Sequence, residues 1–565
     1  LGFVQTVNAA MQLHEDRDVL LLNSDTIVHN DWLDRILAHR EGKVASITPF
    51  SNNATICSTP HIGDDNPDYE QPFEASALQD HAHRETNAGE HVEIPTGIGF
   101  CMWLSRAALN EVGLFDAEAF GKGYGEESDW CMRTSEAGYS HRLACDVFVY
   151  HKGGGSFQGE MDERRAAAAS ILRKRWPHYD GKVAKWIAED PARPYRLAAS
   201  ARRQQHVQKP VILHITHNLG GGVDKYVNEL TKHFADQAHH LLLTPTPSGG
   251  SQLRSHDPND GIELTFDTMR GHYELVEALL NMGITRVHVH HVLGFVEHQL
   301  RQIVLAMGVP FEYTIHDYYL LCPQVFLADF DGNYCGEPDT EGCNACLERR
   351  PNYGATDISK WREYHSWWIT TADRLLCPSH DVAMRLLGYY PEAKITCMPH
   401  LEPELKQPKL APVPLAEDEP IRIAIIGALS HHKGAFRVRA FIESAAAKGM
   451  AMELHHFGFN TEKPPKSRSG NVSFHAHGKY DAADLPELLA DVNPHLTWFT
   501  ATWPETYSYT LSQAMLHGAP IWAPRIGAFT ERVQSVPWCF TYDNNLAGDA
   551  LLGAFESVQQ ALLQK

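Results

Sequence analysis

The sequence predicts an α/β protein with three sheets in series along its 565 residues, the second and third of them parallel and doubly wound. Three apolar segments carry this prediction: residues 19–22, 211–217 and 421–426. Each has the length of a strand and is followed by polar residues or glycines. Ligands of open α/β sheets bind beyond the carboxyl ends of the strands, so the residues after these segments are the first candidates for a binding site.

The first segment ends at Asn23, Ser24 and Asp25. Their oxygen atoms stand where a metal-bound diphosphate is expected in such a sheet. An aspartate at a strand end more often caps the next element. The interpretation of Asp25 therefore depends on the polar residues that follow it along the chain.

Residues 95–157 contain a second polar group, in which two glycines allow close backbone approach to a ligand and a predicted helix begins with carboxylates. Its members are Gly97, Gly99, Glu126, Glu127, Asp129 and His151, the last of them before glycines at 153–155. Asp129 and Arg133 are spaced to pair along one helix face, which leaves Glu126 or Glu127 available as a general base. The alternative is a solvated acidic first turn, because Asp and Glu favour helix N-termini.

In this order the two groups resemble the latter part of a family 2 glycosyltransferase with a GT-A fold, over residues 1–160. Residues 23–25 resemble the Asp-x-Asp metal motif of that family, and residues 124–133 its base-bearing motif. The resemblance implies that Asp25 and His151 hold Mn²⁺ or Mg²⁺ on a donor diphosphate. It also implies catalytic roles for Glu127, as the base, and for Asp129, and inversion of configuration at the anomeric carbon. The Rossmann-like module would be truncated, since the family's nucleotide-binding strand would precede Leu1.

Two stretches separate these motifs from the next segment. The polar tract between Asp34 and Glu93 reads as irregular, either a surface loop or a frame for the acceptor. Residues 161–209 are rich in Ala, Arg and Lys and predict a helical linker. The basic run from Arg193 to Arg203 fits solvated linker charges or contact with anionic lipid head groups.

Residues 210–400 are predicted to form one domain, which begins with the strand at 211–217. Gly220, Gly221 and Gly222 follow it and lead into an amphipathic helix, where backbone amides and the helix dipole converge on an anion. Such turns also simply connect strands to helices. A later strand ends at His316 and Asp317, and His316 is a candidate contact for a donor sugar or acceptor, or a residue hydrogen-bonded within its loop.

Four cysteines follow within 25 residues: Cys322, Cys335, Cys343 and Cys346. Four thiols in a short loop can bind structural Zn²⁺ as a tetrahedron. The spacing between them is irregular, so reduced thiols or a disulfide are the alternatives.

Residues 401–565 are predicted to form the last domain, which begins with the strand at 421–426. Gly427 ends this strand, and the ammonium of Lys433 follows where it can neutralise a leaving diphosphate. Near the end of the chain Glu505 precedes a predicted helix that contains Gln513.

Residues 211–565 resemble a family 4 glycosyltransferase of GT-B fold, in which two facing Rossmann-like domains hold the donor between them. The motifs that carry the resemblance are Gly220–Gly222, His316–Asp317, Gly427 with Lys433–Gly434, and the Glu-x7-Glu region at Glu505. It implies donor binding by Gly221, Gly222 and Gly427, a contact of Lys433 with the diphosphate, and catalytic roles for His316 and Glu505. It further implies retention of configuration without a metal.

Two positions depart from the family 4 pattern. Gln513 stands where the second Glu is expected to contact the ribose, and an amide still hydrogen-bonds a ribose hydroxyl. Ala428 stands where an arginine often follows the glycine, which removes one positive charge from the phosphate site.

Composition limits the possible partners and locations. A net charge of -21 argues against nucleic acid as a partner. No run of 18 apolar residues predicts a transmembrane helix, and eleven cysteines, an odd number, favour a reducing compartment. We expect a cytoplasmic protein that can contact the inner face of the cytoplasmic membrane.

Together the two resemblances predict a tandem hexosyltransferase. It would add sugars from nucleotide-sugar donors to a glycan or lipid-linked glycan, in bacterial cell-surface polysaccharide synthesis by analogy with similar tandem proteins. The alternatives are that one module is a non-catalytic scaffold or glycan-binding domain, or that the protein binds glycans without turnover. A nucleotide-sugar epimerase or dehydrogenase is disfavoured, since no Gly-x-Gly-x-x-Gly turn follows any predicted strand.

Overall fold

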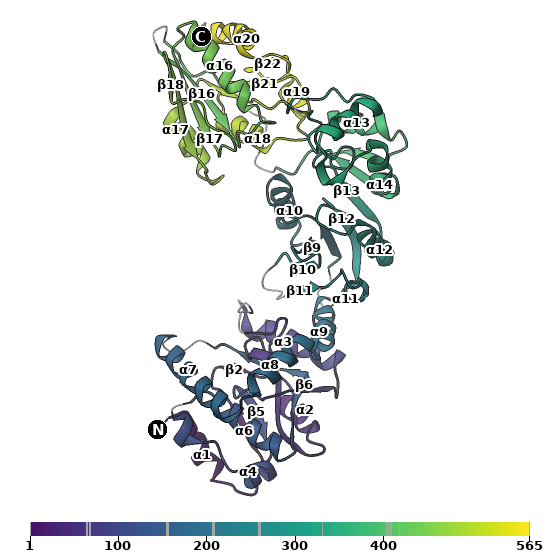
Figure 1. Ribbon diagram of the computed structural model, residues 1–565, viewed down its shortest axis with the longest axis vertical. Coiled ribbons are helices and arrows are strands. Elements are labelled where there is room, and N and C mark those ends of the chain that lie inside the picture. Colours follow the sequence, from purple (N-terminus) through teal and green to yellow (C-terminus); the bar gives the residue numbers. More distant parts are fainter. Residues whose placement is uncertain are drawn as a thin grey trace. The chain divides into compact units, whose positions relative to one another are not determined.

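A computed structural model describes the protein from residue 2 to residue 563, apart from 64, 65, 67, 68, 70, 122, 154–157, 206–208, 258–261, 330, 403, 404, 406–409, 417 and 418. Three large sheets with helices packed on them follow one another along the chain (Figure 1). Contacts divide the chain into two compact units, one with Leu1–Ile215, Phe234–Val287 and Val292–Val309, the other with Thr216–His233, His288–His291 and Pro310–Lys565. The predicted α/β class with parallel sheets is confirmed.

The first sheet has five strands in the order β1-β5-β3-β6-β4. Its strands are β1 (Val19–Leu22), β3 (Val44–Phe50), β4 (His91–Glu93), β5 (Cys101–Leu104) and β6 (Ser140–Phe148). β3 and β6 run parallel, whereas β5 is antiparallel to β1 and β3, and β4 to β6. β1 matches the predicted strand, but it lies at the sheet edge and only Leu21 in it is buried.

The tract between Asp34 and Glu93 is not irregular, and that prediction is wrong. It contains β3, which is buried over its whole length, and helix α3 (Pro72–Thr86). The polar residues of β3 concealed the strand, because they find partners inside the core: the Ser46 hydroxyl lies 2.7 Å from Nδ1 of His141. A buried polar residue is tolerated where its hydrogen bond is made.

Further short elements complete the first sheet's surroundings. They are helices α1 (Phe3–Met11), α2 (Trp32–Ala38), α4 (Arg106–Val112), α5 (Ala117–Phe120) and α6 (Glu126–Glu136), the 3₁₀ turn η1 (Thr55–Cys57), and a ribbon of β2 (Thr26–Ile27) with β7 (Tyr150–His151). The ribbon is antiparallel and pairs Thr26 with His151. It therefore joins the end of the Asn23–Asp25 turn to the histidine predicted 126 residues later.

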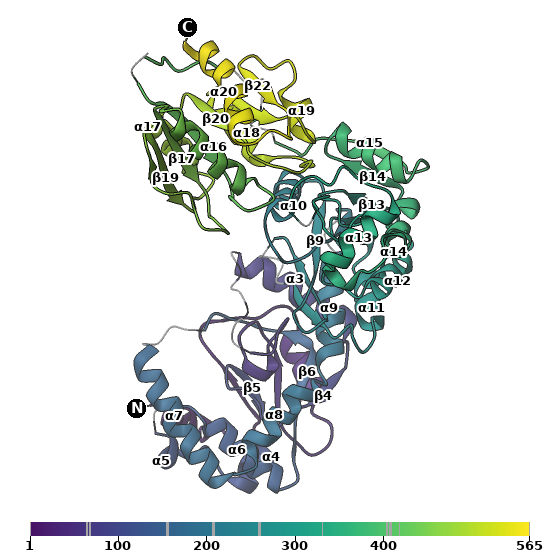
Figure 2. The same ribbon diagram turned by 45° about the horizontal axis from the view of Figure 1, so that its top comes forward.

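The stretch predicted as a helical linker forms three helices: α7 (Gln158–Arg175), α8 (Tyr179–Glu189) and α9 (Arg193–Gln205). α7 lies beside α5 and α6, where Ala168 and Leu172 pack against Phe120 (Figure 2). The basic residues of α9 are paired or buried, although Arg193 and Arg202 remain partly exposed. Arg196 is 2% exposed and pairs with Asp190, and Arg203 is buried and donates to the Gln79 side chain of α3.

The second sheet has eight strands in the order β11-β10-β9-β8-β12-β13-β14-β15. They are β8 (Val211–Ile215), β9 (His239–Pro245), β10 (Ser251–Ser255), β11 (Glu263–Phe266), β12 (Ile284–Val289), β13 (Phe311–Thr314), β14 (Arg374–Cys377) and β15 (Ile395–Cys397). The accompanying helices are α10 (Gly222–His233), α11 (Tyr273–Asn281), α12 (Glu297–Met307), α13 (Thr340–Arg349), α14 (Ile358–Thr371) and α15 (His380–Tyr389), with the 3₁₀ turn η3 (Asn352–Gly354). β8 pairs in parallel with β9, and β14 pairs in parallel with β13 and β15, while β9, β10 and β11 form an antiparallel edge.

The third sheet has seven strands in the order β18-β19-β17-β16-β20-β21-β22. They are β16 (Ile421–Ile426), β17 (Met452–Phe457), β18 (Arg468–Ser469), β19 (Val472–Gly478), β20 (Leu496–Trp498), β21 (Ile521–Pro524) and β22 (Cys539–Tyr542). Helices α16 (Ala435–Ala447), α17 (Leu485–Val492), α18 (Tyr509–His517), α19 (Ala528–Val533) and α20 (Gly548–Leu563) pack on it, with α16 beside α20 (Figure 1). All pairs except the short β18–β19 ladder are parallel, as the sequence predicts.

In the described part of the chain, no helix combines the length and the apolar character that crossing a bilayer requires.

Candidate active sites

The first candidate site joins Asp25 and His151 at the β2–β7 ribbon. Nε2 of His151 lies 3.6 Å from Oδ1 of Asp25, and the backbone N–H of Lys152 donates to the Asp25 carbonyl at 3.0 Å. The Asp25 side chain is 39% exposed. Two residues that the sequence resemblance assigned to one metal therefore lie side by side and open to solvent.

Hydrogen bonds fix the orientation of the His151 ring. Its Nδ1 lies 2.8 Å from the carbonyl oxygen of Asn53, which only accepts, so Nδ1 carries the proton. Nε2 then presents its lone pair toward Asp25. A backbone carbonyl on one ring nitrogen is the usual means of preparing the other nitrogen for a metal, so these residues fit a divalent cation.

The second candidate pair is Glu126 with Glu127 at the start of α6. Burial raises the pKa of both carboxyls, and the neighbouring Glu127 raises that of Glu126 further. Glu126 is 2% exposed, and no group among the described residues hydrogen-bonds its Oε2. The acidic turn is therefore not solvated, and the pair has the raised basicity that a general base near neutral pH needs.

Gly99 allows Glu127 to reach its position. A Cβ atom at residue 99 would lie 2.6 Å from Oε1 of Glu127, and the backbone N–H of Gly99 hydrogen-bonds this carboxylate. The close approach expected at Gly99 is thus made to a side chain of the protein itself.

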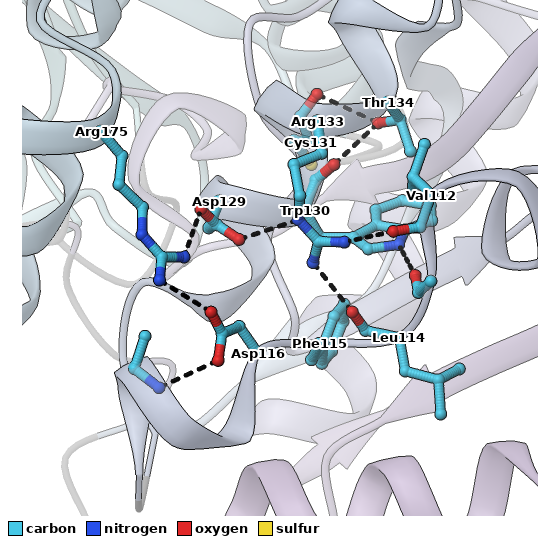
Figure 3. Close-up of polar contacts among 12 residues, drawn as sticks. Val112, Leu114, Phe115, Asp116, Asp129, Trp130, Cys131, Arg133, Thr134 and Arg175 are labelled. Atoms are coloured by element: carbon cyan, nitrogen blue, oxygen red, sulfur yellow. Dashed lines mark hydrogen bonds and ion pairs between the residues drawn. The ribbon is translucent and has the colours of Figure 1, made fainter.

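The carboxylate of Asp129 joins α6 to the end of α7. Its Oδ2 accepts from Nε of Arg133 at 2.9 Å, as the spacing predicts, and its Oδ1 accepts from Arg175 at 3.2 Å (Figure 3). Oδ1 also accepts from Nε1 of Trp176 at 3.0 Å. The side chain is fully buried. Because both oxygens are occupied, Asp129 holds α6 against α7, and its catalytic role stays a prediction.

The glycines after β8 lie beside α18. Gly220 and Gly221 have φ values of +71° and +82°, which glycine adopts without strain, and Gly222 begins α10. A Cβ at Gly222 would meet the ring of Tyr509 at 4.0 Å, and Nζ of Lys225 lies 4.5 Å from the centre of that ring. The predicted phosphate turn therefore lies next to the helix that carries Gln513.

His316 belongs to a cluster of aromatic and imidazole rings. Burial lowers the pKa of His316 well below its ordinary value, and His400 adds to this effect. Tyr226 lies between them, with ring centres 5.1 Å from His316 and 4.5 Å from His400. A neutral imidazole at this place suits hydrogen bonding to sugar hydroxyls.

Asp317 is held beside His291. Although burial opposes ionisation, His291, with Nε2 at 3.2 Å from Oδ2, keeps the pKa of Asp317 below its ordinary value. Asp317 also accepts from the N–H of Tyr319 at 2.9 Å. These contacts fix the turn that carries His316.

Lys433 and Glu505 form an ion pair at the carboxyl ends of β16 and β20. Nζ of Lys433 lies 2.6 Å from Oε1 of Glu505, whose side chain is 9% exposed. The hydroxyl of Thr506 donates to the backbone carbonyl of His316. The structure thus brings together three residues that the sequence placed up to 189 positions apart.

Two glycines shape the backbone around this pair. A Cβ at Gly434 would lie 2.0 Å from the carbonyl oxygen of Thr500, and one at Gly527 would lie 2.7 Å from the backbone N of Glu505. Gly427, with φ +106°, ends β16, and its carbonyl accepts from Nε2 of His456 at 2.8 Å. Backbone atoms occupy the space of a side chain at Gly434 and Gly527, and the positive φ favours glycine at Gly427.

Sequence reasoning missed Arg532 and Glu402. Arg532 donates to the carbonyl of Ser508 at 2.7 Å and to the Ser512 hydroxyl at 2.6 Å, next to Gln513, which is half-buried in α18. Glu402 accepts from the hydroxyls of Ser512 and Tyr507. Nothing local in the sequence marks either residue, because the contacts join segments about 20 to 110 residues apart.

The N-terminus of α15 is capped from a distance. The carboxylate of Glu531 accepts from the backbone N–H of His380 at 2.9 Å and of Asp381 at 3.3 Å. Beside this contact lies a cavity of about 600 Å³, whose lining includes Tyr334, Arg385, Arg525, Asn544 and Asn545. Planar amide and guanidinium groups next to an aromatic ring are suited to hydroxyl-rich ligands.

The four cysteines of the predicted zinc site line one small cavity. No three of their sulfur atoms lie within 4.8 Å of one another, so they do not form a preassembled tetrahedron. All eleven cysteines are free thiols.

Residues 220–400 match the family model described as Glycosyltransferase Family 4. This region is a glycosyltransferase domain. It contains the glycine turn after β8 and the His316–Asp317 turn, and the Lys433–Glu505 pair follows it in the chain. The protein is therefore a glycosyltransferase, and the family 4 part of the predicted resemblance is confirmed over these residues.

Solved structures similar to this chain include a sucrose-phosphate synthase from Thermosynechococcus elongatus, with 16% identity over 63% of this chain and 90% of the other, and a TM-score of 0.42. Another is Anabaena HepE in complex with UDP and glucose, with 14% identity over 62% and 89% and a TM-score of 0.38. The catalytic domain of starch synthase IV from Arabidopsis thaliana, bound to ADP and acarbose, has 14% identity over 63% and 94% and a TM-score of 0.37. No curated protein matches the chain.

Proposed function

We propose that residues 211–565 transfer a sugar from a nucleoside diphosphate donor to a hydroxyl of a glycan or lipid-linked glycan. The observation that carries this proposal is the Lys433–Glu505 pair, 2.6 Å apart at the carboxyl ends of two parallel strands in a chain with a family 4 domain. This edge of the sheet is where such folds bind ligands. The pair places a cation and an acceptor of hydroxyl hydrogen bonds side by side.

The reaction follows from a change of partners. When the donor enters, the ammonium of Lys433 moves from Glu505 to the diphosphate, and Glu505 turns to the hydroxyls of the sugar. As the bond between sugar and phosphate breaks, negative charge grows on the diphosphate, and Lys433 stabilises it most in the transition state. The amide of Gln513 hydrogen-bonds the ribose. Gly222 and Gly427, which have no side chain, let the protein backbone contact the donor. We propose transfer with retention and without a metal.

The acceptor is proposed to occupy the cavity beside Glu531. Its amide, guanidinium and tyrosine groups suit a sugar, and about 600 Å³ is sufficient for one or two sugar rings.

The first module is proposed to carry a second, metal-dependent transferase site of the family 2 kind. Asp25 and Nε2 of His151, which the side-chain amide of Asn23 also contacts at 3.4 Å, would hold Mn²⁺ or Mg²⁺, which neutralises the donor diphosphate when bound. Glu127 would take the proton of the acceptor hydroxyl. The alternative, a non-catalytic first module, remains a defined outcome of the test.

Two linked sites of this kind suit the stepwise synthesis of a cell-surface polysaccharide, since the linkage raises the concentration of the second site near the first product. We propose that the protein works in the cytoplasm on such a glycan. Contact with the membrane surface would need another basic region than α9, because the arginines of α9 are already paired or buried.

The test is release of nucleoside diphosphate from a panel of nucleotide sugars, with and without EDTA, in the presence of glycan acceptors. Release that resists EDTA and requires Lys433 supports the proposed second site. A further EDTA-sensitive activity with another donor preference supports the first. Silence with every donor would contradict both proposals.

A further inference from the structure

The loop between β13 and α13 and the start of α13 itself carry four thiols that line one small cavity. This cysteine quartet consists of Cys322, Cys335, Cys343 and Cys346. All four line the same cavity of about 20 Å³, which is closed by apolar side chains such as Leu347 and Ile358. Cys343 and Cys346 lie three residues apart on one face of α13. The cavity has room for an ion but not for an organic ligand.

Hydrogen-bond donors surround the sulfur atoms. The backbone N–H of Glu337 donates to Sγ of Cys335 at 3.4 Å, and the N–H of Gln324 donates in the same way to Cys322, two residues before it. Nη2 of Arg362 lies 3.7 Å from Sγ of Cys343. Burial outweighs these donors and raises the pKa of Cys322 and Cys335, so their sulfurs stay protonated unless a cation displaces the protons.

We propose that the cysteine quartet binds one Zn²⁺ ion. Zn–S bonds of about 2.3 Å in a tetrahedron place the sulfurs about 3.8 Å apart, closer than the quartet is in the metal-free arrangement. The ion enters by exchanging with four thiol protons, which go to solvent, and no oxidant or reductant takes part. The product carries two net negative charges, and Arg362 offsets one of them.

A disulfide explains these contacts less well. It would use two thiols, would need an oxidant, and would leave the other two buried without a role. The N–H and guanidinium donors reach three different cysteines, whereas one disulfide would engage only two of the four.

The zinc would order a loop that supports the proposed donor site. Phe326 stacks on His432 with ring centres 4.3 Å apart and also contacts Trp503. The Thr502 hydroxyl donates to the carbonyl of Gly332 at 2.9 Å. Phe326 and Gly332 lie between the first two cysteines, so fixing the sulfurs fixes the surface behind Lys433. This inference goes beyond the proposed function, and its primary readout needs no activity.

The experiment measures metal content in the full chain purified without added metal under reducing conditions. We expect one zinc per chain, and replacement by Co²⁺ should give the visible absorption bands of a tetrahedral thiolate site. The double variant Cys343→Ser/Cys346→Ser should lose the zinc. The matched variant Cys539→Ser, in β22 away from the quartet, should keep it.

Three results would overturn the inference. They are the absence of zinc even after reconstitution with excess metal, retention of zinc by the double variant, and cobalt bands without sulfur ligation. If the double variant fails to fold, titration of the unaltered protein with a mercurial decides the matter. It should release one zinc as four buried thiols react, and release that does not accompany thiol reaction would count against the quartet. For zinc-depleted protein we also expect a donor KM raised several-fold.

Discussion

The two candidate sites differ in the source of the positive charge that each would present to a donor diphosphate. Around Asp25 and His151 the protein offers a carboxylate and an imidazole nitrogen. In the proposed function, a metal ion bound there would supply the positive charge for the diphosphate. Around Glu505 the protein provides its own cation, Lys433, already paired at 2.6 Å. The comparison teaches that the Lys433–Glu505 site already holds its positive charge before the donor binds. The proposed Asp25–His151 site would depend on the concentration of divalent metal ions in solution.

The sharpest way to break this comparison is to remove the built-in cation. Lys433→Ala should lower kcat/KM for EDTA-resistant diphosphate release by about 10²–10³-fold, because the leaving group loses its charge partner. Steady-state kinetics measures the loss. Lys448→Ala removes a lysine from a surface pair with Glu556, 2.7 Å apart, and should leave the rate unchanged. Equal activity of both variants would contradict the assignment of Lys433.

The variant Asp25→Asn tests the proposed metal ion of the first site. The amide keeps the shape but loses the charge, so we expect Mn²⁺ affinity to fall about 10–100-fold, the scale of losing a group that supports a metal ligand. Isothermal titration calorimetry measures the affinity directly. Asp180→Asn changes an exposed carboxylate that pairs with Arg173 and serves as the control. Unchanged Mn²⁺ binding in Asp25→Asn would remove this residue from the metal site.

The rigidity of the built-in pair depends on Gly527. Gly527→Ala places a Cβ 2.6–2.7 Å from the backbone of Pro504 and Glu505 at φ +57°, so we expect a loss of about 1–3 kcal/mol of unfolding free energy together with lower activity. Gly449→Ala is the matched control: its φ is +71°, but nothing lies within 4 Å. It should cost about 1 kcal/mol or less and keep activity. Chemical denaturation separates the two, and equal losses would show that crowding at Gly527 is unimportant.

The acidic pair of the first module predicts a pH effect on stability. The folded pKa of Glu126 lies above that of an exposed glutamate, so its contribution to stability is complete below the ordinary glutamate pKa and is lost as pH rises through the folded value. Glu126→Gln should therefore raise the free energy of unfolding more at pH 8 than at pH 4, by an amount on the order of 1 kcal/mol, and Tm should rise with it. Thermal melts at both pH values check this. A stabilisation that is independent of pH would contradict burial of the charge as its cause.

The smallest expected effect concerns the acceptor. Asn545→Ala removes one amide from the cavity beside Glu531 and should raise the acceptor KM about fivefold, since one hydrogen bond contributes about 1 kcal/mol. The donor KM should not change. A rise in donor KM alone would place the donor, rather than the acceptor, in this cavity.

Local signals made several structural elements of the candidate sites predictable. The strand ends at 19–22 and 421–426, the Asp129–Arg133 spacing and the glycine turn at 220–222 are each set by a few neighbouring residues, and the structure has them as expected. The buried strand β3 was missed because its Ser and Thr residues are polar. The partner that allows Ser46 to be buried lies 95 positions away in the sequence, so no local pattern reveals it. Arg532 and Glu402 were missed for the same reason: their contacts exist only after folding.

Helix α9 has a practical consequence for anyone who produces the first module alone. Arg203 reaches Gln79 of α3, and the side-chain amide of Asn87 donates to the carbonyl of Tyr195 at 3.1 Å. A fragment cut at residue 160 would expose this surface of α3 to solvent and leave buried polar groups without partners. We therefore expect a fragment that extends through Gln205 to express in soluble form, and the shorter one to aggregate.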